Sequence, residues 1–219
     1  SGLCNHYTTH SRNINRSTRK NLQKGIGKME QYESQIRHTF KNKQSGYDLP
    51  TGQTESDYDI LVGYITEHKP KCIVEYGSGF STRVIQKTIN DLGLDTKFFS
   101  FEDNKYYYDI IKEHIELTDV VKLVPFERQD DKVGRYYHSY DGMEDVDFVM
   151  IDGPDTGRYN IRATTNVVDL HERFPNNKIN VFIQGRDSTT NYYIEKYGDK
   201  FKHINKNGWG VLWVEIWNS

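Results

Sequence analysis

The clearest candidate for chemistry is a glycine loop, with the sequence Glu75-Tyr76-Gly77-Ser78-Gly79-Phe80-Ser81-Thr82. Gly77 and Gly79 permit a tight turn and let a ligand approach the backbone closely. Ser81 or Thr82 can cap a helix that follows the loop. Thr82 stands where a dinucleotide-binding loop has its third glycine. By itself, the loop therefore predicts a turn that can border a ligand.

An acidic pair, Glu102 and Asp103, follows this loop along the chain. Glu102 lies 23 residues after Gly79. In a doubly wound α/β fold, an acid about 20 residues beyond the glycine loop accepts hydrogen bonds from a ribose. The loop and the acid together predict a ligand that contains adenosine.

Two further acids are candidate general bases. Asp152 follows the apolar segment 147–151, and Asp187 follows the apolar segment 179–183. The reference pKa of aspartate is about 3.9, so burial would have to raise the pKa before either carboxylate became an efficient base near neutral pH. The alternative for Asp152 is a structural role, in which it fixes its own loop or a ligand ammonium group.

Three arginines and a tyrosine are candidate acceptor-binding residues. Arg158, Arg162 and Arg186 follow the same two apolar segments, and paired guanidinium groups suit a carboxylate or a phosphate. Tyr137 lies in the aromatic stretch 135–140 and could stack on a sugar or base ring. The alternative for each of these residues is an ordinary surface or packing role.

Short apolar runs alternate with helical periods from residue 47 onward. We predict strands over 71–76, 97–101, 120–126, 147–151 and 179–183. We predict helices over 55–68, 81–92, 105–117, 160–174 and 189–197, and a terminal hairpin over 201–217 around Asn207-Gly208. This order indicates a parallel sheet with helices on both faces and an antiparallel strand at its end. Such a sheet binds ligands beyond the carboxyl ends of its strands, which is where the candidate residues lie.

The segments VEYGSGFST, FSFED and DFVMIDGP resemble the class I S-adenosylmethionine-dependent methyltransferases. The resemblance covers residues 54–219 and implies a doubly wound, mostly parallel, seven-stranded sheet with an antiparallel terminal strand. The E-x-G-S-G-x-S-T form and the IDGP loop resemble a branch whose members often act on small molecules or saccharides. The resemblance therefore implies S-adenosylmethionine as cofactor and O-methylation of a small or saccharide-like hydroxyl acceptor.

The resemblance also implies roles for individual residues. The methionine portion of the cofactor would border the glycine loop, the ribose would bind Glu102, and the adenine would lie near Asp103 and the segment 128–131. The full implied cofactor set is Glu75, Tyr76, Gly77, Ser78, Gly79, Ser81, Glu102, Asp103, Asp130 and Asp152. Gln184 stands where related sequences often have an acid, which argues against a metal-assisted mechanism because Mg²⁺ prefers carboxylate oxygens. We therefore expect no metal site.

Charge divides the chain into two parts. Residues 1–46 carry nine Lys or Arg and two Glu, a net charge of +7, so the remainder carries −9 of the chain's net −2. We expect a basic, partly helical extension over 1–46 and an S-adenosylmethionine-binding domain over 47–219. The extension suggests an anionic partner such as nucleic acid, or docking of the extension on the domain itself.

Composition excludes several classes of protein. No apolar run approaches about 18 residues, so we expect no membrane span. The N-terminal stretch has no apolar core typical of a signal peptide, and two cysteines cannot build a disulfide framework. We therefore expect a cytoplasmic protein. Two alternatives to a small-molecule methyltransferase remain. One is a nucleic-acid-binding module or RNA methyltransferase that uses the basic extension. The other is an NAD-dependent oxidoreductase, which the missing third glycine and the terminal hairpin disfavour.

Overall fold

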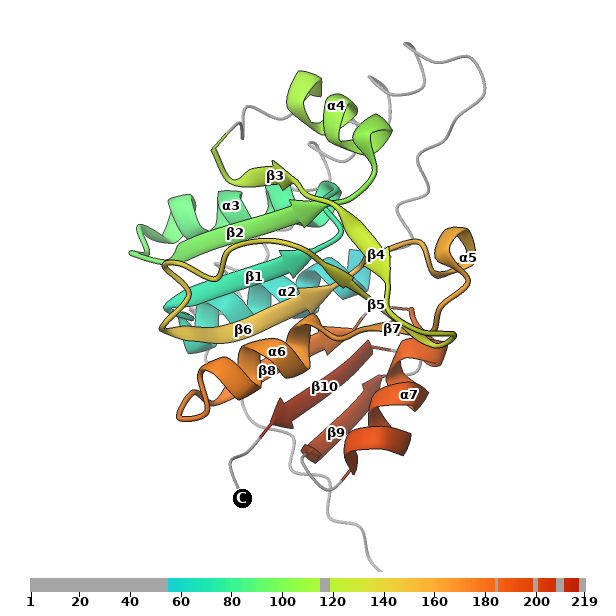
Figure 1. The fold of residues 1–219 in the computed structure, drawn as a ribbon. Helices are drawn as coiled ribbons and strands as arrows, with labels where there is room; N and C mark the ends of the chain where they lie inside the picture. The colour runs from blue at the N-terminus through green and yellow to red at the C-terminus, as the bar shows by residue number, and fades with distance from the viewer. Residues whose placement is uncertain (1–54, 115–118, 184, 199–200, 208–210, 217–219) are drawn as a thin grey trace, which may run out of the picture. The chain divides into compact units, whose positions relative to one another are not determined.

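The computed structural model describes residues 55–114, 119–183, 185–198, 201–207 and 211–216 (Figure 1). The chain divides into two units, residues 1–50 and 51–219, and all described residues belong to the second unit. The predicted basic extension and its boundary at residues 46–47 lie outside the described residues.

A seven-stranded sheet with the order β3-β2-β1-β6-β8-β10-β9 is the centre of the second unit. The first five strands of this order are parallel, while β10 is antiparallel to both β8 and β9. The strands are β1 Cys72–Tyr76, β2 Lys97–Glu102, β3 Val121–Leu123, β6 Val146–Ile151, β8 Ile179–Ile183, β9 Phe201–Asn207 and β10 Val211–Ile216. The direction in which successive strands are added reverses between β1 and β6. Ligands of open α/β sheets bind at such a reversal, beyond the carboxyl ends of the strands.

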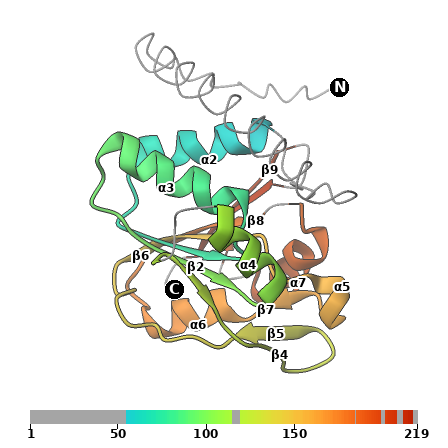
Figure 2. The same ribbon diagram turned by 90° about the horizontal axis from the view of Figure 1, so that it is seen from above.

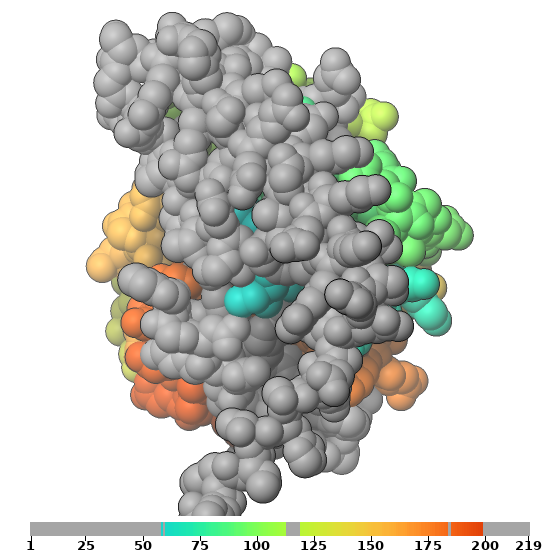
Figure 3. All heavy atoms as spheres, turned by 180° about the vertical axis from the view of Figure 1, so that it is seen from behind, coloured from blue at the N-terminus to red at the C-terminus, as the bar shows by residue number. Residues whose placement is uncertain are grey.

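Helices cover both faces of this sheet, with α2 and α3 on one face and α6 on the other (Figure 2). The helices are α2 Glu55–His68, α3 Phe80–Leu92, α4 Lys105–His114, α5 Thr156–Tyr159, α6 Asn166–Arg173 and α7 Asp187–Tyr197. Side chains of a strand alternate between its two faces. Val74 and Tyr76 accordingly join the core cluster that contains Leu170 of α6, whereas Glu75 contacts Ser81 of α3. In the view of Figure 3, α3 in green and α7 in orange-red lie on opposite sides of the unit.

A second sheet with the order β4-β5-β7 is one point at which the sequence prediction was wrong. We predicted one strand over 120–126, but β3 ends at Leu123 and a separate strand, β4, begins at Phe126. Pro125 lies between them and has no backbone N–H to donate to a sheet ladder. The small sheet comprises β4 Phe126–Arg128, β5 Val133–Tyr136 and β7 Ala163–Thr164.

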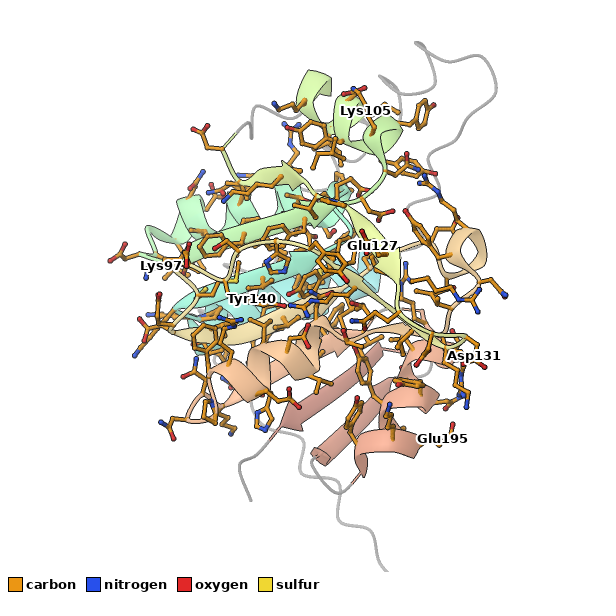
Figure 4. All side chains as sticks on the ribbon, in the orientation of Figure 1. Lys97, Lys105, Glu127, Asp131, Tyr140 and Glu195 are labelled. Atoms are coloured by element: carbon orange, nitrogen blue, oxygen red, sulfur yellow. The ribbon has the colours of Figure 1, made fainter. Side chains whose placement is uncertain are left out.

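The predicted helix over 160–174 was also too long at its start. Residues 163–164 pair with β5 in parallel, and α6 begins only at Asn166. In the described residues, no helix lies in the crossover from β3 to β6. Aromatic side chains of this crossover pack on the main sheet instead. The His138 ring stacks on Phe101 with centroids 3.9 Å apart, and Tyr140 lies over the middle of the sheet (Figure 4).

Candidate active site

Glu75 is a fully buried carboxylate beneath the glycine loop. It accepts hydrogen bonds of 2.6 Å from the hydroxyls of Ser81, Thr82 and Ser100. Burial raises the pKa of Glu75 to about 7, although the three hydroxyl donors favour the charged form and oppose this rise. Glu75 therefore faces hydroxyl groups of α3 and β2.

Two relays connect this buried carboxylate to the loop above it. The Gly79 N–H donates to Thr82 Oγ1 at 2.9 Å, and Thr82 Oγ1 donates in turn to Glu75. The Ser78 hydroxyl lies 2.6 Å from the Ser100 hydroxyl, which also donates to Glu75. The position of the loop is thus fixed by hydrogen bonds that end on one buried carboxylate.

The two loop glycines have different surroundings. Gly77 has a φ of +89°, and a Cβ on it would lie 2.3 Å from the backbone nitrogen of Gly153. A side chain is therefore excluded at Gly77 by both conformation and space. Gly79 has a φ of −174°, and a Cβ on it would meet no atom within 4 Å. The structure thus requires glycine at position 77 and leaves open space beside position 79.

Glu102 ends β2 and is 4% exposed. One carboxylate oxygen accepts the Ser78 N–H at 3.0 Å, and the other accepts the Asn104 N–H at 2.8 Å. Burial raises the pKa of Glu102 to about 8. A carboxylate has about four lone-pair sites, so beside its backbone donors Glu102 can still accept a hydrogen bond from a hydroxyl group. The structure therefore brings together the predicted glycine loop and the predicted ribose-binding acid.

Asp103 turns toward a different set of groups. Its carboxylate accepts hydrogen bonds from Tyr136 Oη at 3.2 Å and from Tyr159 Oη at 2.6 Å. Arg158 Nη1 lies 3.9 Å away, and the Asp103 side chain is 5% exposed. Asp103 therefore connects the end of β2 to α5, the short helix that follows β6.

Asp152 begins the loop after β6. The backbone N–H groups of Asp152 and Gly153 both donate to Tyr76 O, at 2.9 and 2.6 Å. The Arg186 guanidinium donates to the carbonyls of Pro154, at 2.6 Å, and of Asp152. The charge of Asp152 also contributes to the raised pKa of Glu75. The loop is thus held at the carboxyl end of β1, beside the glycine loop.

The three predicted acceptor-binding arginines have separate partners. Arg186 binds the loop carbonyls, and Arg158 lies near Asp103. Arg162 forms an ion pair with Glu195 of α7 at 3.2 Å, with its guanidinium over the Tyr192 ring. Each of the three arginines therefore contacts a different protein group.

Other predicted residues lie at the periphery. Asp130 is exposed in the turn between β4 and β5, where it accepts the N–H groups of Lys132 and Val133. Tyr137 is exposed beside Arg135, and Asp187 is exposed in the first turn of α7. In Figure 4, the label Glu127 marks β4 and the label Asp131 marks the turn between β4 and β5 that contains Asp130. Gln184 lies outside the described residues.

The sequence predicted no role at this site for Ser100 or Tyr159, and for Tyr136 it predicted only a place in the aromatic stretch 135–140 that could stack on a ring. Ser100 binds Glu75, and Tyr136 and Tyr159 bind Asp103. A serine one residue from the core position Phe101 carries a weak signal, because strand alternation directs it to the face of Glu75. The tyrosine contacts join separate loops, and no local pattern indicates them. Across the described ranges, no cluster of three His, Cys, Asp or Glu side chains could hold a metal ion. Likewise, none of the described helices is long and apolar enough to cross a membrane.

Comparison with known proteins gives a likeness of fold. No family model matches the chain, and no curated protein matches its sequence. The SAH-bound methyltransferase PaMTH1 of Podospora anserina is 12% identical, with 98% of this chain and 99% of that chain covered and a TM-score of 0.50. A putative O-methyltransferase from Klebsiella pneumoniae is 13% identical, with 87% and 100% covered and a TM-score of 0.50. The predicted α/β fold with a mostly parallel sheet, as found in methyltransferases, is thereby confirmed.

Proposed function

We propose that the second unit is an S-adenosylmethionine-dependent methyltransferase that acts on a hydroxyl group of a small or saccharide-like acceptor. The observation that carries the proposal is the hydrogen bond from the Ser78 N–H to Glu102. It joins the glycine loop to the second-strand acid, next to the reversal in strand order. The names of the two structural neighbours, both methyltransferases and one of them SAH-bound, support the same reading.

The chemistry of these residues fits an adenosyl cofactor. Glu102 offers carboxyl oxygens at the end of β2 that can accept hydrogen bonds from a ribose diol. Its pKa is raised to about 8, and such hydroxyl donors would favour the ionised form. The open space beside Gly79 would admit the methionine portion next to the loop backbone. The loop itself is prearranged by its relays to Glu75, so binding need not order it.

The protein's part in the reaction is then mainly one of alignment. When bound, the cofactor supplies an electrophilic methyl group on a sulfonium. Residues of the chain hold the acceptor hydroxyl in line with that methyl group, and such orientation can provide several kcal/mol of a barrier. Asp152 lies at the end of β6 beside the glycine loop and is our candidate to take the hydroxyl proton. Its other proposed role is to fix the loop.

An anionic group on the acceptor is the finer part of the proposal. Arg158 is exposed and lies 3.9 Å from Asp103, so its outward N–H groups can meet a carboxylate or a phosphate. Arg162 and Arg186 have protein partners, and we assign them structural roles. A panel of neutral and acidic saccharides, with RNA as the competing acceptor, tests this part by methyl incorporation with the full chain.

Cofactor binding is the decisive experiment for the proposed function. S-adenosylhomocysteine (SAH) should give heat in titration calorimetry and should raise the melting temperature, because a ligand at 100 times its Kd stabilises the native state by about 2.7 kcal/mol. NADH should do neither. A thermal shift with NADH and none with either S-adenosyl compound would instead establish the oxidoreductase alternative.

A further inference from the structure

The segment after β6 is held at both ends and exposed between them. At its start, Arg186 binds the carbonyls of Asp152 and Pro154. At its end, the Arg162 N–H donates to Lys132 O at 2.6 Å. Between these ends, residues 155–160 include α5, none of whose residues is buried, whereas Ile161 after them belongs to the core. We call residues 155–160 the strap.

Most of the strap's polar contacts lie within the strap itself. Asp155 accepts the N–H groups of Gly157 and Arg158 at 2.9 and 3.2 Å. The contact with the end of β2 is made by Tyr159, whose hydroxyl donates to Asp103 at 2.6 Å. The Tyr159 ring also lies 4.6 Å from the ring of Phe126, between centroids. Tyr159 therefore makes the strap's hydrogen bond to the end of β2, and Arg158 Nη1 lies 3.9 Å from the same Asp103 carboxylate.

The position of this attachment relates it to the proposed cofactor site. Asp103 directly follows Glu102 in the chain. At the other end, Gly153 meets Gly77 so closely that a Cβ on Gly77 would lie 2.3 Å from its nitrogen. The chain thus passes from Gly153, beside the glycine loop, into the strap, which meets the end of β2 at Asp103. The helix α5 of the strap lies beyond the carboxyl ends of the parallel strands (Figure 1). The glycine loop and the end of β2 are the two places that would hold the methionine and ribose portions.

We infer that Asp103 and Tyr159 form a latch that holds the strap closed across the cofactor site, and that this latch must open for the cofactor to enter and its product to leave. The inference rests on the proposed function. It assigns Asp103 as a positioning residue, in place of the adenine contact that the family resemblance implied.

The chemistry of the latch suits a contact that is firm but reversible. A phenol that donates to a carboxylate forms a charge-assisted bond, about twice as strong as a neutral one. Burial and the Asp103 charge raise the pKa of Tyr159 to about 12, so its hydroxyl keeps the proton that it donates at neutral pH. A four-residue helix that contains no buried residue has a low free energy of local opening. Removal of this one bond should therefore favour the open strap.

The experiment is to measure the association and dissociation rate constants of SAH by stopped-flow fluorescence. The full chain is compared with Tyr159→Phe and Asp103→Asn, and with Tyr107→Phe as the matched control. Tyr107 is 39% exposed on α4. In both latch variants, both rate constants should rise about tenfold or more, since a hydrogen bond to a charged group is lost. The Kd should stay within about twofold, because the latch closes over the free and the occupied site alike.

Several outcomes would overturn the latch. The first is that the latch variants have the same rate constants as Tyr107→Phe. The second is that Tyr159→Phe binds SAH more weakly and only its dissociation is faster, which would make Tyr159 a direct ligand contact. Asp103→Asn keeps the test valid if Tyr159→Phe does not fold. Absence of SAH binding to the unmodified chain would overturn the proposed function and the latch together, whereas normal binding with unchanged rates would overturn the latch alone.

Discussion

The backbone N–H of Ser78 donates to the carboxylate of Glu102 across 3.0 Å, although the two residues are 24 positions apart in the sequence. The bond joins the loop after β1 to the end of β2, two parallel neighbours in the sheet. Because parallel strands end at the same edge, residues that follow two neighbouring strands can meet there. A glycine loop and an acid that are far apart in the chain thus become one site.

Replacement of Glu102 by Ala should weaken SAH binding by about 1–3 kcal/mol, the usual cost of removing one partner from a buried hydrogen-bonded group. Titration calorimetry measures this loss. Glu127→Ala is the control, because Glu127 is an exposed carboxylate on β4 (Figure 4). Equal affinities in the two variants would mean that Glu102 does not hold the ribose.

Glu75 should make stability depend on pH. Because its pKa is raised from 4.5 to about 7 in the native state, the native protein keeps a proton that the unfolded chain has lost between these values. Unfolding then releases protons, and stability falls as pH rises through this range. Replacement by Gln removes this titration. The free energy of unfolding of Glu75→Gln, relative to that of the unmodified protein, should therefore rise by on the order of 3 kcal/mol between about pH 5 and pH 8.

Urea unfolding of both proteins at several pH values measures this difference. Glu127→Gln provides the exposed control, whose difference from the unmodified protein should stay nearly constant with pH. A constant difference for Glu75→Gln as well would show that the hydroxyls of Ser81, Thr82 and Ser100 keep Glu75 ionised throughout.

The buried strands were the part of the fold best predicted from the sequence. The run 179–183 matches β8, and the run 147–151 differs from β6 by one residue at its start. Such runs are covered on both faces, so their apolar character is continuous and their ends are marked by polar or glycine residues. The sheet β4-β5-β7 escaped prediction because residues 163–164 are strand-like only through pairing with β5, about 30 residues away in the chain.

The candidate site, like the fold, could be predicted from the sequence only in part. Spacing alone brought Gly77, Gly79 and Glu102 together, because strand topology determines where these residues meet. Spacing also grouped Arg162 with Arg186, but the structure gives one of them Glu195 and the other two loop carbonyls. The partner of a long side chain depends on which neighbours still need a hydrogen bond, and that is decided by tertiary contacts.

The two loop glycines should respond differently to substitution. Gly77→Ala should lower the free energy of unfolding by about 1–3 kcal/mol, because φ is +89° and the new Cβ would overlap Gly153. Gly79→Ala should leave stability nearly unchanged, since its Cβ meets no atom within 4 Å. The new methyl group would, however, occupy the space proposed for the cofactor, so SAH affinity should fall. Thermal unfolding and calorimetry separate the two effects, and normal SAH affinity in Gly79→Ala would contradict the proposed position of the cofactor.

Arg186 and Arg162 offer a final matched pair. Arg186→Gln should lower the free energy of unfolding by about 2 kcal/mol, because the part-buried guanidinium donates to two loop carbonyls that would lose a charged partner. Arg162→Gln should cost less than about 1 kcal/mol, because its pair with Glu195 is at the surface, where solvent screens the charges. The midpoints of urea unfolding measure both losses of stability. Titration calorimetry with SAH then measures whether a change in the loop after β6 alters cofactor affinity. Equal losses of stability would mean that Arg186 does not support the loop after β6. If Arg162→Gln kept its stability but lost most of its acceptor methylation, Arg162 would bind the acceptor, as predicted from the sequence.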